Sequence, residues 1–292
     1  MTFSLVGRCE RTGAVGAVIA SASMAVAARC AAVRAGVGAV CSQSTTDPRL
    51  RGELLDAIAA DVPAGDALAA LVGRAADVAF RQLVVVDAAG GAAGYSGDRA
   101  LGVATDVRAA GAAAAGNLLA DTGVPAAMLA AFTGQAGDDL GDRLIAALRA
   151  GLAAGGEVSP VRSAGMLVAE TQPWPVTDLR VDWHDDPVGQ LAMLWQLWRP
   201  QADSYVGRAL RPSEIVQLCA ASARPWPCPA EGSRSGERER AGRHRPVDTR
   251  SRPGRQPGHG AGGGPGAGPA RLPIGAAART MAVRLPPGLA RR

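Results

Sequence analysis

The chain has 292 residues with a formal net charge of +5 at pH 7, and all 31 basic residues are arginine. Residues 1–220 hold 17 Arg and 22 acidic residues, a net charge of −5, whereas residues 221–292 hold 14 Arg and 4 acidic residues, a net charge of +10. The absence of lysine excludes Schiff-base catalysis, a P-loop lysine and a Ser-Lys pair. Because the first part is acidic, affinity for nucleic acid is not expected there and would have to come from the tail.

The chain begins with a pattern typical of antiparallel strands. Residues 2–8 and 14–21 alternate apolar with small or polar side chains, and the turn-rich residues 10–13 between them predict a hairpin. Residues 25–34 predict a short helix or a buried crossing segment. Residues 36–43 again have strand character, with glycines that indicate close approach of backbones.

Pairs of helices then alternate with strands. A proline after Asp47 predicts a helix through Leu54, Leu55 and Ile58. The other expected elements are a helix at 63–72, strands at 82–87, 92–96 and 107–117, helices at 125–132 and 140–153, a hairpin of 163–169 with 177–183, and a helix at 187–198. The last helix has an apolar stripe of Val188, Leu191, Leu194, Trp195 and Trp198, which is typical of a core-facing side.

This order predicts an α+β fold in which two antiparallel sheets are faced by layers of helices. We place the domain boundary near residue 212, with one domain at 1–212 and an Arg-, Gly- and Pro-rich tail at 213–292. The tail contains too little apolar surface to offset the entropy of ordering, so we expect it to be disordered. There are two alternative interpretations of the tail. It could be a basic arm that binds RNA or membranes, or it could be the translation of a shifted reading frame.

Thr2 is the first candidate catalytic residue. A small residue at this position normally allows Met1 to be removed, and Thr2 would then combine a hydroxyl nucleophile with a free α-amine as its base. Residues 1–220 contain one histidine, His184, so an α-amine is one of only two nitrogen bases available near neutral pH. The alternative is an ordinary β-strand that begins with threonine.

The remaining composition points to a protein of a reducing compartment. The five cysteines are widely spaced without a CxxC pair, and we interpret them as buried, unpaired side chains. With one histidine before residue 220, no metal site is expected there. The sequence has no apolar run long enough to cross a membrane, so a cytoplasmic location is expected. The alternative is a signal peptide at residues 14–28, which would remove Thr2.

Several runs, in the right order, resemble one family. These runs are residues 2–6, 35–40, 81–87, 116–119, 178–187 and 199–206. Together they are similar to domain of unknown function 1028, a family placed in the N-terminal nucleophile (Ntn) hydrolase superfamily. The resemblance spans about residues 2–212. It implies a four-layer αββα sandwich of two antiparallel sheets, and amide hydrolysis by the residue that follows Met1.

The resemblance also implies roles for particular residues. Thr2 would be the nucleophile and, through its α-amine, the general base. Asn117 would lie with Gly116 at a strand end and donate to a developing oxyanion; a turn residue that satisfies backbone groups is the alternative. Ser21 would hydrogen-bond the amine, with an ordinary strand-end hydroxyl as the alternative. Gly116 and Gln43 would line the substrate pocket. Asp185 or Asp186 would cap the helix that begins at Pro187 rather than take part in catalysis.

The chain departs from the family pattern in loops that could line the pocket. Ala22 and Ser23 stand where a lysine is expected after the second strand, and Gln172-Pro173-Trp174-Pro175 replaces a Gly- and Asn-rich segment. We therefore keep two functions open. One is an amidohydrolase that cleaves a small amide or peptide-like substrate through an acyl-enzyme on Thr2. The other is a catalytically silent protein of the same fold that binds a ligand or partner. No cofactor, membrane or nucleic acid is expected for residues 1–212, and homo-oligomerisation is left open.

Overall fold

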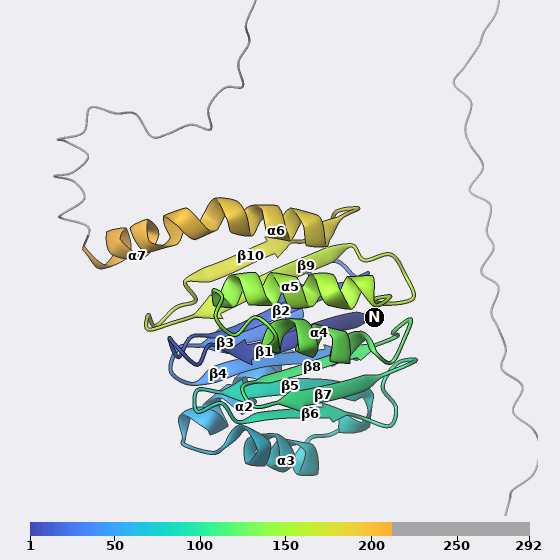
Figure 1. Cartoon of the computed structure of the whole chain (residues 1–292). Helices are drawn as coiled ribbons and strands as arrows, with labels where there is room; N and C mark the ends of the chain where they lie inside the picture. Colours follow the sequence, from blue (N-terminus) through green and yellow to red (C-terminus); the bar gives the residue numbers. More distant parts are fainter. Residues whose placement is uncertain (212–292) are drawn as a thin grey trace, which may run out of the picture. The chain divides into compact units, whose positions relative to one another are not determined.

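The computed structural model describes residues 1–211. Two antiparallel sheets form its centre (Figure 1). The six-stranded sheet has the order β10-β9-β2-β1-β8-β7, with strands β1 (Thr2–Arg8), β2 (Val15–Ser21), β7 (Thr105–Ala109), β8 (Ala112–Asn117), β9 (Ser163–Ala169) and β10 (Thr177–Val181). The four-stranded sheet has the order β3-β4-β5-β6, with strands β3 (Ala31–Arg34), β4 (Gly38–Ser44), β5 (Arg81–Asp87) and β6 (Ala92–Ser96).

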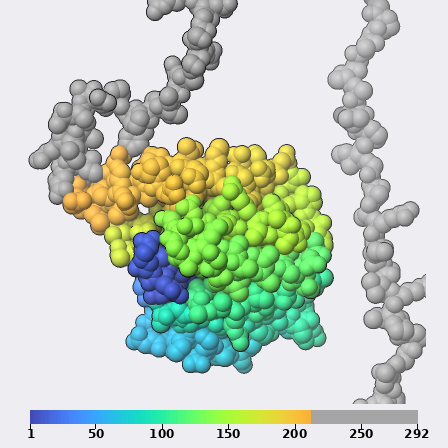
Figure 2. Space-filling view, in the orientation of Figure 1, coloured from blue at the N-terminus to red at the C-terminus, as the bar shows by residue number. Residues whose placement is uncertain are grey.

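Helices cover the outer face of each sheet. Helices α4 (Val124–Thr133), α5 (Leu140–Ala153) and α6 (Pro187–Trp198) pack on the six-stranded sheet, and α2 (Arg49–Ala59) and α3 (Ala64–Arg74) pack on the four-stranded sheet. The shorter elements are α1 (Val26–Cys30), η1 (Val78–Phe80), η2 (Arg199–Gln201) and α7 (Ala202–Leu210). In the space-filling view the orange surface of α6 and α7 adjoins the green surface of α4 and α5, and the blue surface of the α2–α3 region lies on the opposite side (Figure 2).

The strands are held by apolar side chains that alternate between the two faces of each sheet. In β1, Phe3 and Leu5 pack under α4 and α5, whereas Val6 points to the other sheet. The middle core lies between the sheets and contains Val6, Ile19, Val84 and Val86. A third core joins the four-stranded sheet to α2 and α3. The predicted α+β class with two antiparallel sheets is therefore confirmed.

Two segments differ from the sequence expectation. Residues 107–117 were expected to form one strand, but the chain turns back at Gly111 (φ +74°), so β7 and β8 are two strands of a hairpin. A turn with positive φ is easy for glycine and strained for residues with a Cβ. Residues 25–34 contain both a short helix, α1, and an edge strand, β3. Helix α7, directly after η2, was not expected.

The N-terminal cap of α6 follows the prediction. The Asp186 side chain accepts a hydrogen bond from the Gly189 backbone N–H at 2.9 Å, and Pro187 occupies the first helical position. Asp139 caps α5 in the same way, through the N–H of Gly141 at 2.9 Å. Each cap satisfies a backbone donor that the helix itself leaves free.

The N-terminal hairpin lies in the middle of the six-stranded sheet. Strand β2 pairs with both β1 and β9, and β1 pairs with both β2 and β8. A mature chain that began near Ala28 would therefore lack two central strands. Among residues 1–211, no helix has the length and apolar character needed to span a bilayer. The expected disordered tail lies outside the described residues.

Candidate active site

Three strand ends meet at Thr2. Strand β1 begins there, and both of its neighbours run antiparallel to it, so they end where β1 begins. On one side Thr2 is the register partner of Asn117, the last residue of β8. On the other side lies Ser21, the last residue of β2. Thr2 is 5% exposed, and Ser21 and Asn117 are fully buried. The structure thus brings together the three residues predicted to be catalytic.

A chain of hydroxyl groups extends from Thr2. The Thr2 hydroxyl oxygen lies 3.4 Å from that of Ser21, and the Ser21 and Ser23 hydroxyls are 2.8 Å apart. Both Thr2 and Ser21 also donate to the carbonyl oxygen of Met1. The Arg29 guanidinium donates to the Ser23 hydroxyl at 2.8 Å. Arg29 therefore supplies a positive charge beside the segment in which the expected lysine is replaced by Ala22 and Ser23.

The Asn117 side chain is held by a buried polar network. One N–H of its amide donates to Gln82 Oε1 at 3.1 Å, which leaves its second N–H for another acceptor. Its own Oδ1 is buried and has no hydrogen-bond partner among the described residues. An amide with spare donor and acceptor capacity beside a hydroxyl group is suited to bind a polar group of a ligand.

Gln43 and Gly116, predicted to line the substrate pocket, belong to the same buried hydrogen-bond network as Asn117. Gln43 is fully buried; it accepts from the Ser4 hydroxyl at 2.7 Å and donates to Gln82 at 2.8 Å. The Gly116 carbonyl accepts from Gln82 Nε2 at 2.9 Å. A Cβ at Gly116 would lie 2.4 Å from Leu119. Through Gln82, both residues help to fix the position of the Asn117 side chain.

The backbone directly after Asn117 is strained. Leu118 has φ of +50°, a conformation that costs roughly 1–2 kcal/mol for a residue with a Cβ. Two backbone hydrogen bonds hold it there, from the Leu118 N–H to the Leu101 carbonyl at 2.8 Å and from the Val158 N–H to the Leu118 carbonyl at 3.0 Å. Such strain is typical of functional sites, where the surrounding structure fixes one geometry.

Glu157 is a site residue that the sequence analysis did not find. It is 6% exposed. A backbone bridge places it opposite Leu119, which follows Asn117 by two residues. Burial raises the pKa of its carboxyl to about 7. The α-amine of Met1 and the backbone of Ala22 act in the opposite direction and lower this pKa. The same α-amine is half-buried; burial lowers its pKa, while Glu157 acts to raise it. A buried carboxyl and a buried amine thus lie within each other's electrostatic reach at the start of β1.

His184 takes no part in this arrangement. It is exposed, and its Nδ1 accepts from the Asp186 backbone N–H at 2.9 Å. Its own backbone N–H donates to the Arg162 carbonyl at 2.8 Å. These bonds order the loop that enters α6.

Comparison with known proteins identifies the family. The model of a family of unknown function, DUF1028, matches residues 2–191. The chain belongs to the DUF1028 family. The crystal structure of protein SPO2555 from Silicibacter pomeroyi, described with the same family model, is 31% identical to this chain, with a TM-score of 0.63. The match covers 68% of this chain and 85% of that one. No curated protein matches the chain.

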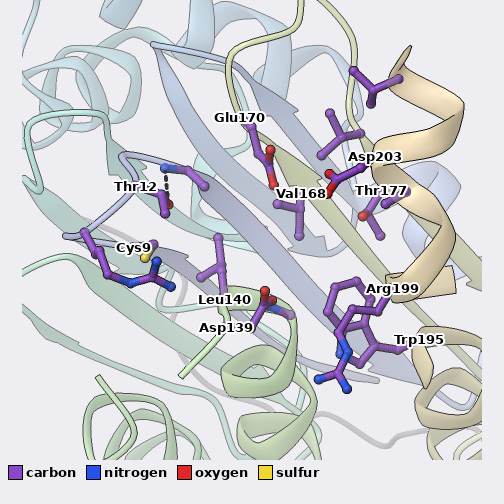
Figure 3. A pocket seen from close by; sticks show the side chains of 16 residues that line it. Cys9, Thr12, Asp139, Leu140, Val168, Glu170, Thr177, Trp195, Arg199 and Asp203 are labelled. Carbon is purple, nitrogen blue, oxygen red and sulfur yellow. Dashed lines mark hydrogen bonds between the residues drawn. The ribbon is translucent and has the colours of Figure 1, made fainter. Parts of the chain in front are cut away.

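This DUF1028 chain also has a hollow at the opposite end of β1 (Figure 3). The cavity has a volume of about 250 Å³ and lies between Cys9, which follows β1, and Trp195 of α6. Three carboxylates line it, those of Asp139, Glu170 and Asp203, together with the guanidinium groups of Arg11 and Arg199. Burial raises the pKa of Glu170, and the negative charges of Asp203 and Asp139 raise it further. The hollow is a separate feature from the Thr2 site, because the length of β1 lies between them.

Proposed function

We propose that this protein is an N-terminal-nucleophile amidohydrolase that cleaves a small amide through an acyl-enzyme on Thr2. The observation that carries the proposal is the meeting of Thr2, Ser21 and Asn117 at three adjoining strand ends. A buried hydroxyl, a hydrogen-bonding neighbour and an amide donor at one point are the groups that acyl transfer needs. The proposal requires Thr2 to have a free α-amine, and hence the removal of Met1.

The reaction would proceed in two steps. The Thr2 hydroxyl oxygen attacks the substrate carbonyl carbon, and its proton passes to the Thr2 α-amine. The C–N bond breaks, the leaving amine takes that proton, and an ester remains on Thr2. Water then attacks the ester carbon and its proton passes to the same α-amine. The C–O bond to Thr2 breaks, the acid is released, and the α-ammonium returns the proton to the Thr2 oxygen. The free N–H of Asn117 would donate to the oxyanion in both steps.

The packing of the layers supports this assignment. Helices, a four-stranded sheet, a six-stranded sheet and helices follow one another, with one apolar core between each pair of layers. We assign this order to the four-layer αββα arrangement of the Ntn hydrolases. Because one fold supports many functions, the assignment to the superfamily rests on Thr2 and its neighbours as much as on the layers.

Labelling with an electrophile tests the proposal. The full chain is purified, its intact mass shows whether Met1 is absent, and it is then treated with a β-lactone and digested. We expect one adduct, on Thr2, and none in Thr2→Ala. Thr2→Ser should keep labelling, since it keeps both the hydroxyl and the α-amine. Protein that lacks Met1, is folded and remains unlabelled would overturn the proposal.

A binding protein without catalytic activity is the second candidate. The hollow at the far end of β1 favours it, because its three carboxylates and two arginines could hold a polar ligand without any contact to Thr2. The two candidates differ in a direct way. A ligand of the hollow would shift the fluorescence of Trp195, whereas a substrate of the proposed hydrolase would compete with labelling of Thr2.

A further inference from the structure

Met1 occupies the position in which an acyl group would face Thr2. Its carbonyl oxygen accepts hydrogen bonds from both the Thr2 and the Ser21 hydroxyls. The residue is half-buried beside the strand ends that form the site. When Met1 is removed, its place becomes free directly in front of the proposed nucleophile. The groups around Met1 therefore indicate what kind of acyl group fits there.

Glu157 lies within electrostatic reach of the Met1 α-amine, and its carboxyl group is unsatisfied. The side chain is 6% exposed, and neither of its oxygens has a hydrogen-bond partner of good geometry among the described residues. A buried carboxyl without partners costs free energy, so such a group is expected to have a ligand. The α-amine of Met1 and the backbone of Ala22 are the groups that stabilise its negative charge.

The backbone places Glu157 there by a tight turn. After α5 the chain passes through Gly155 (φ +112°) and Gly156 (φ +58°), conformations that glycine adopts without strain. The Ala120 N–H then donates to the Gly156 carbonyl at 3.1 Å, and Glu157 bridges to Leu119. Since Asn117 precedes Leu119 by two residues and pairs with Thr2, the turn brings Glu157 near the start of β1.

We propose that Glu157 binds the α-ammonium group of the substrate, so that the acyl part is an aminoacyl group with a free amine. The α-amine of Met1 occupies the ammonium position in the structure, and the Met1 carbonyl occupies that of the scissile carbonyl. This inference rests on the proposed function and defines its substrate class: amides and short peptides that are cleaved after their first residue. The chemistry of the two steps is unchanged, and Glu157 takes part as a binding residue.

Other groups near the Met1 amine do not provide the same recognition. Arg29 has the same sign of charge as an ammonium group and lowers the pKa of the amine. Cys30 acts in the opposite direction, but burial raises the pKa of its thiol, which therefore stays neutral near pH 7. Glu157 is thus the acidic group suited to pair with a substrate cation.

The experiment compares three substrates on protein that lacks Met1: methionyl p-nitroanilide, its N-acetyl derivative and the neutral ester p-nitrophenyl acetate. We expect the free amine to raise kcat/KM at least 10-fold over the acetylated compound. Glu157→Gln should lower kcat/KM for methionyl p-nitroanilide at least 10-fold more than it lowers the rate with the ester. Glu10→Gln, on the exposed β1–β2 turn, is the control and should behave as wild type.

The outcomes separate this inference from the proposed function. If Thr2 reacts with the ester but the acetylated and free-amine substrates are cleaved equally, the aminoacyl assignment is wrong and the hydrolase remains. Equal losses with every substrate in Glu157→Gln would mean that Glu157 acts on the Thr2 amine, which also overturns the assignment. No reaction of Thr2 with any of the three would overturn both.

A measurement on wild type alone covers the case in which Glu157→Gln does not fold. Methioninamide and N-acetylmethioninamide are compared as competitors of β-lactone labelling at Thr2. We expect protection by the free amine at a concentration at least 10-fold lower than by the acetylated compound. Equal protection by both would contradict recognition of an ammonium group.

Discussion

Thr2 and Asn117 are register partners at the ends of β1 and β8, although the whole four-stranded sheet lies between them in the sequence. The pairing sets the side-chain amide beside the hydroxyl without any contribution from a loop. Sites built on strands are held more precisely than sites on loops. A change at either residue should therefore alter the chemistry before it alters the fold.

Asn117→Ala tests this relationship. Loss of the amide donor should lower the rate of Thr2 acylation by p-nitrophenyl acetate by roughly 100- to 1,000-fold, the range for one oxyanion donor. Ser96→Ala is the matched control. Ser96 also contacts Gln82, at 2.8 Å, but it lies on β6 of the four-stranded sheet and not beside Thr2. Similar rate losses in both variants would show that Asn117 acts only through the buried network.

Gln82→Leu should destabilise the protein severely. Gln82 accepts from Gln43 and Asn117 and donates to the Gly116 carbonyl. Its loss leaves two donors and an acceptor buried without partners, and at 1–3 kcal/mol for each group we expect about 3 kcal/mol or more. Urea unfolding measures the change. Gln135→Leu, on an exposed loop, should stay within about 0.5 kcal/mol of wild type.

Two glycines in helices should respond in opposite directions to alanine. A Cβ at Gly141 in α5 would lie 2.3 Å from the Trp195 ring, so Gly141→Ala should cost about 1–3 kcal/mol through overpacking. At Gly52 in α2 nothing lies within 4 Å of the added Cβ, so Gly52→Ala should stabilise by up to about 1 kcal/mol. Thermal unfolding of both variants distinguishes these effects, and destabilisation by Gly52→Ala would contradict the packing described for α2.

The carboxyl of Glu157 should make stability depend on pH. Burial raises its pKa from the usual 4.5 to about 7 in the folded protein. Between these values the folded protein binds more protons than the unfolded chain, so stability falls as pH rises through this range. Glu157→Gln removes the effect, and its stability relative to wild type should be greater at pH 8 than at pH 5.

Urea unfolding of Glu157→Gln and wild type at the two pH values measures this change, with Glu10→Gln as the surface control. The same difference at both pH values would show that the folded carboxyl titrates near its ordinary range. The α-amine of Met1 partly opposes the effect of burial. Removal of Met1 is therefore expected to alter the size of the difference, and the intact mass should be known for each preparation.

Much of the fold could be predicted because its strands alternate in the ordinary way. The antiparallel hairpin of β1 and β2 alone requires Ser21 to end beside Thr2, which the sequence analysis anticipated. The β7–β8 hairpin was missed, since residues 112–115 are all alanine and offer no alternation, and the turn depends on the single residue Gly111.

Glu157 and Arg29 could not be found by pattern. Glu157 follows two glycines in a connection between α5 and β9, and nothing local indicates that this turn returns to Leu119. Arg29 reaches Ser23 from α1, a helix of five residues without a clear sequence signal. Both depend on contacts between distant segments, which periodicity does not report. The only hint in the sequence is that this acidic residue directly follows a Gly-Gly pair.

The central place of β2 has a consequence for how the chain is made. Its pairing partner β9 leaves the ribosome about 10–30 s after β2 at ordinary rates of synthesis. During that interval the first hairpin has an open edge, and its N-terminus is still accessible to an aminopeptidase. Once β8 and β9 have docked, Met1 is half-buried and Thr2 is nearly covered. Trimming of Met1 would then be a step that belongs to biosynthesis, and refolded protein that missed it would retain Met1.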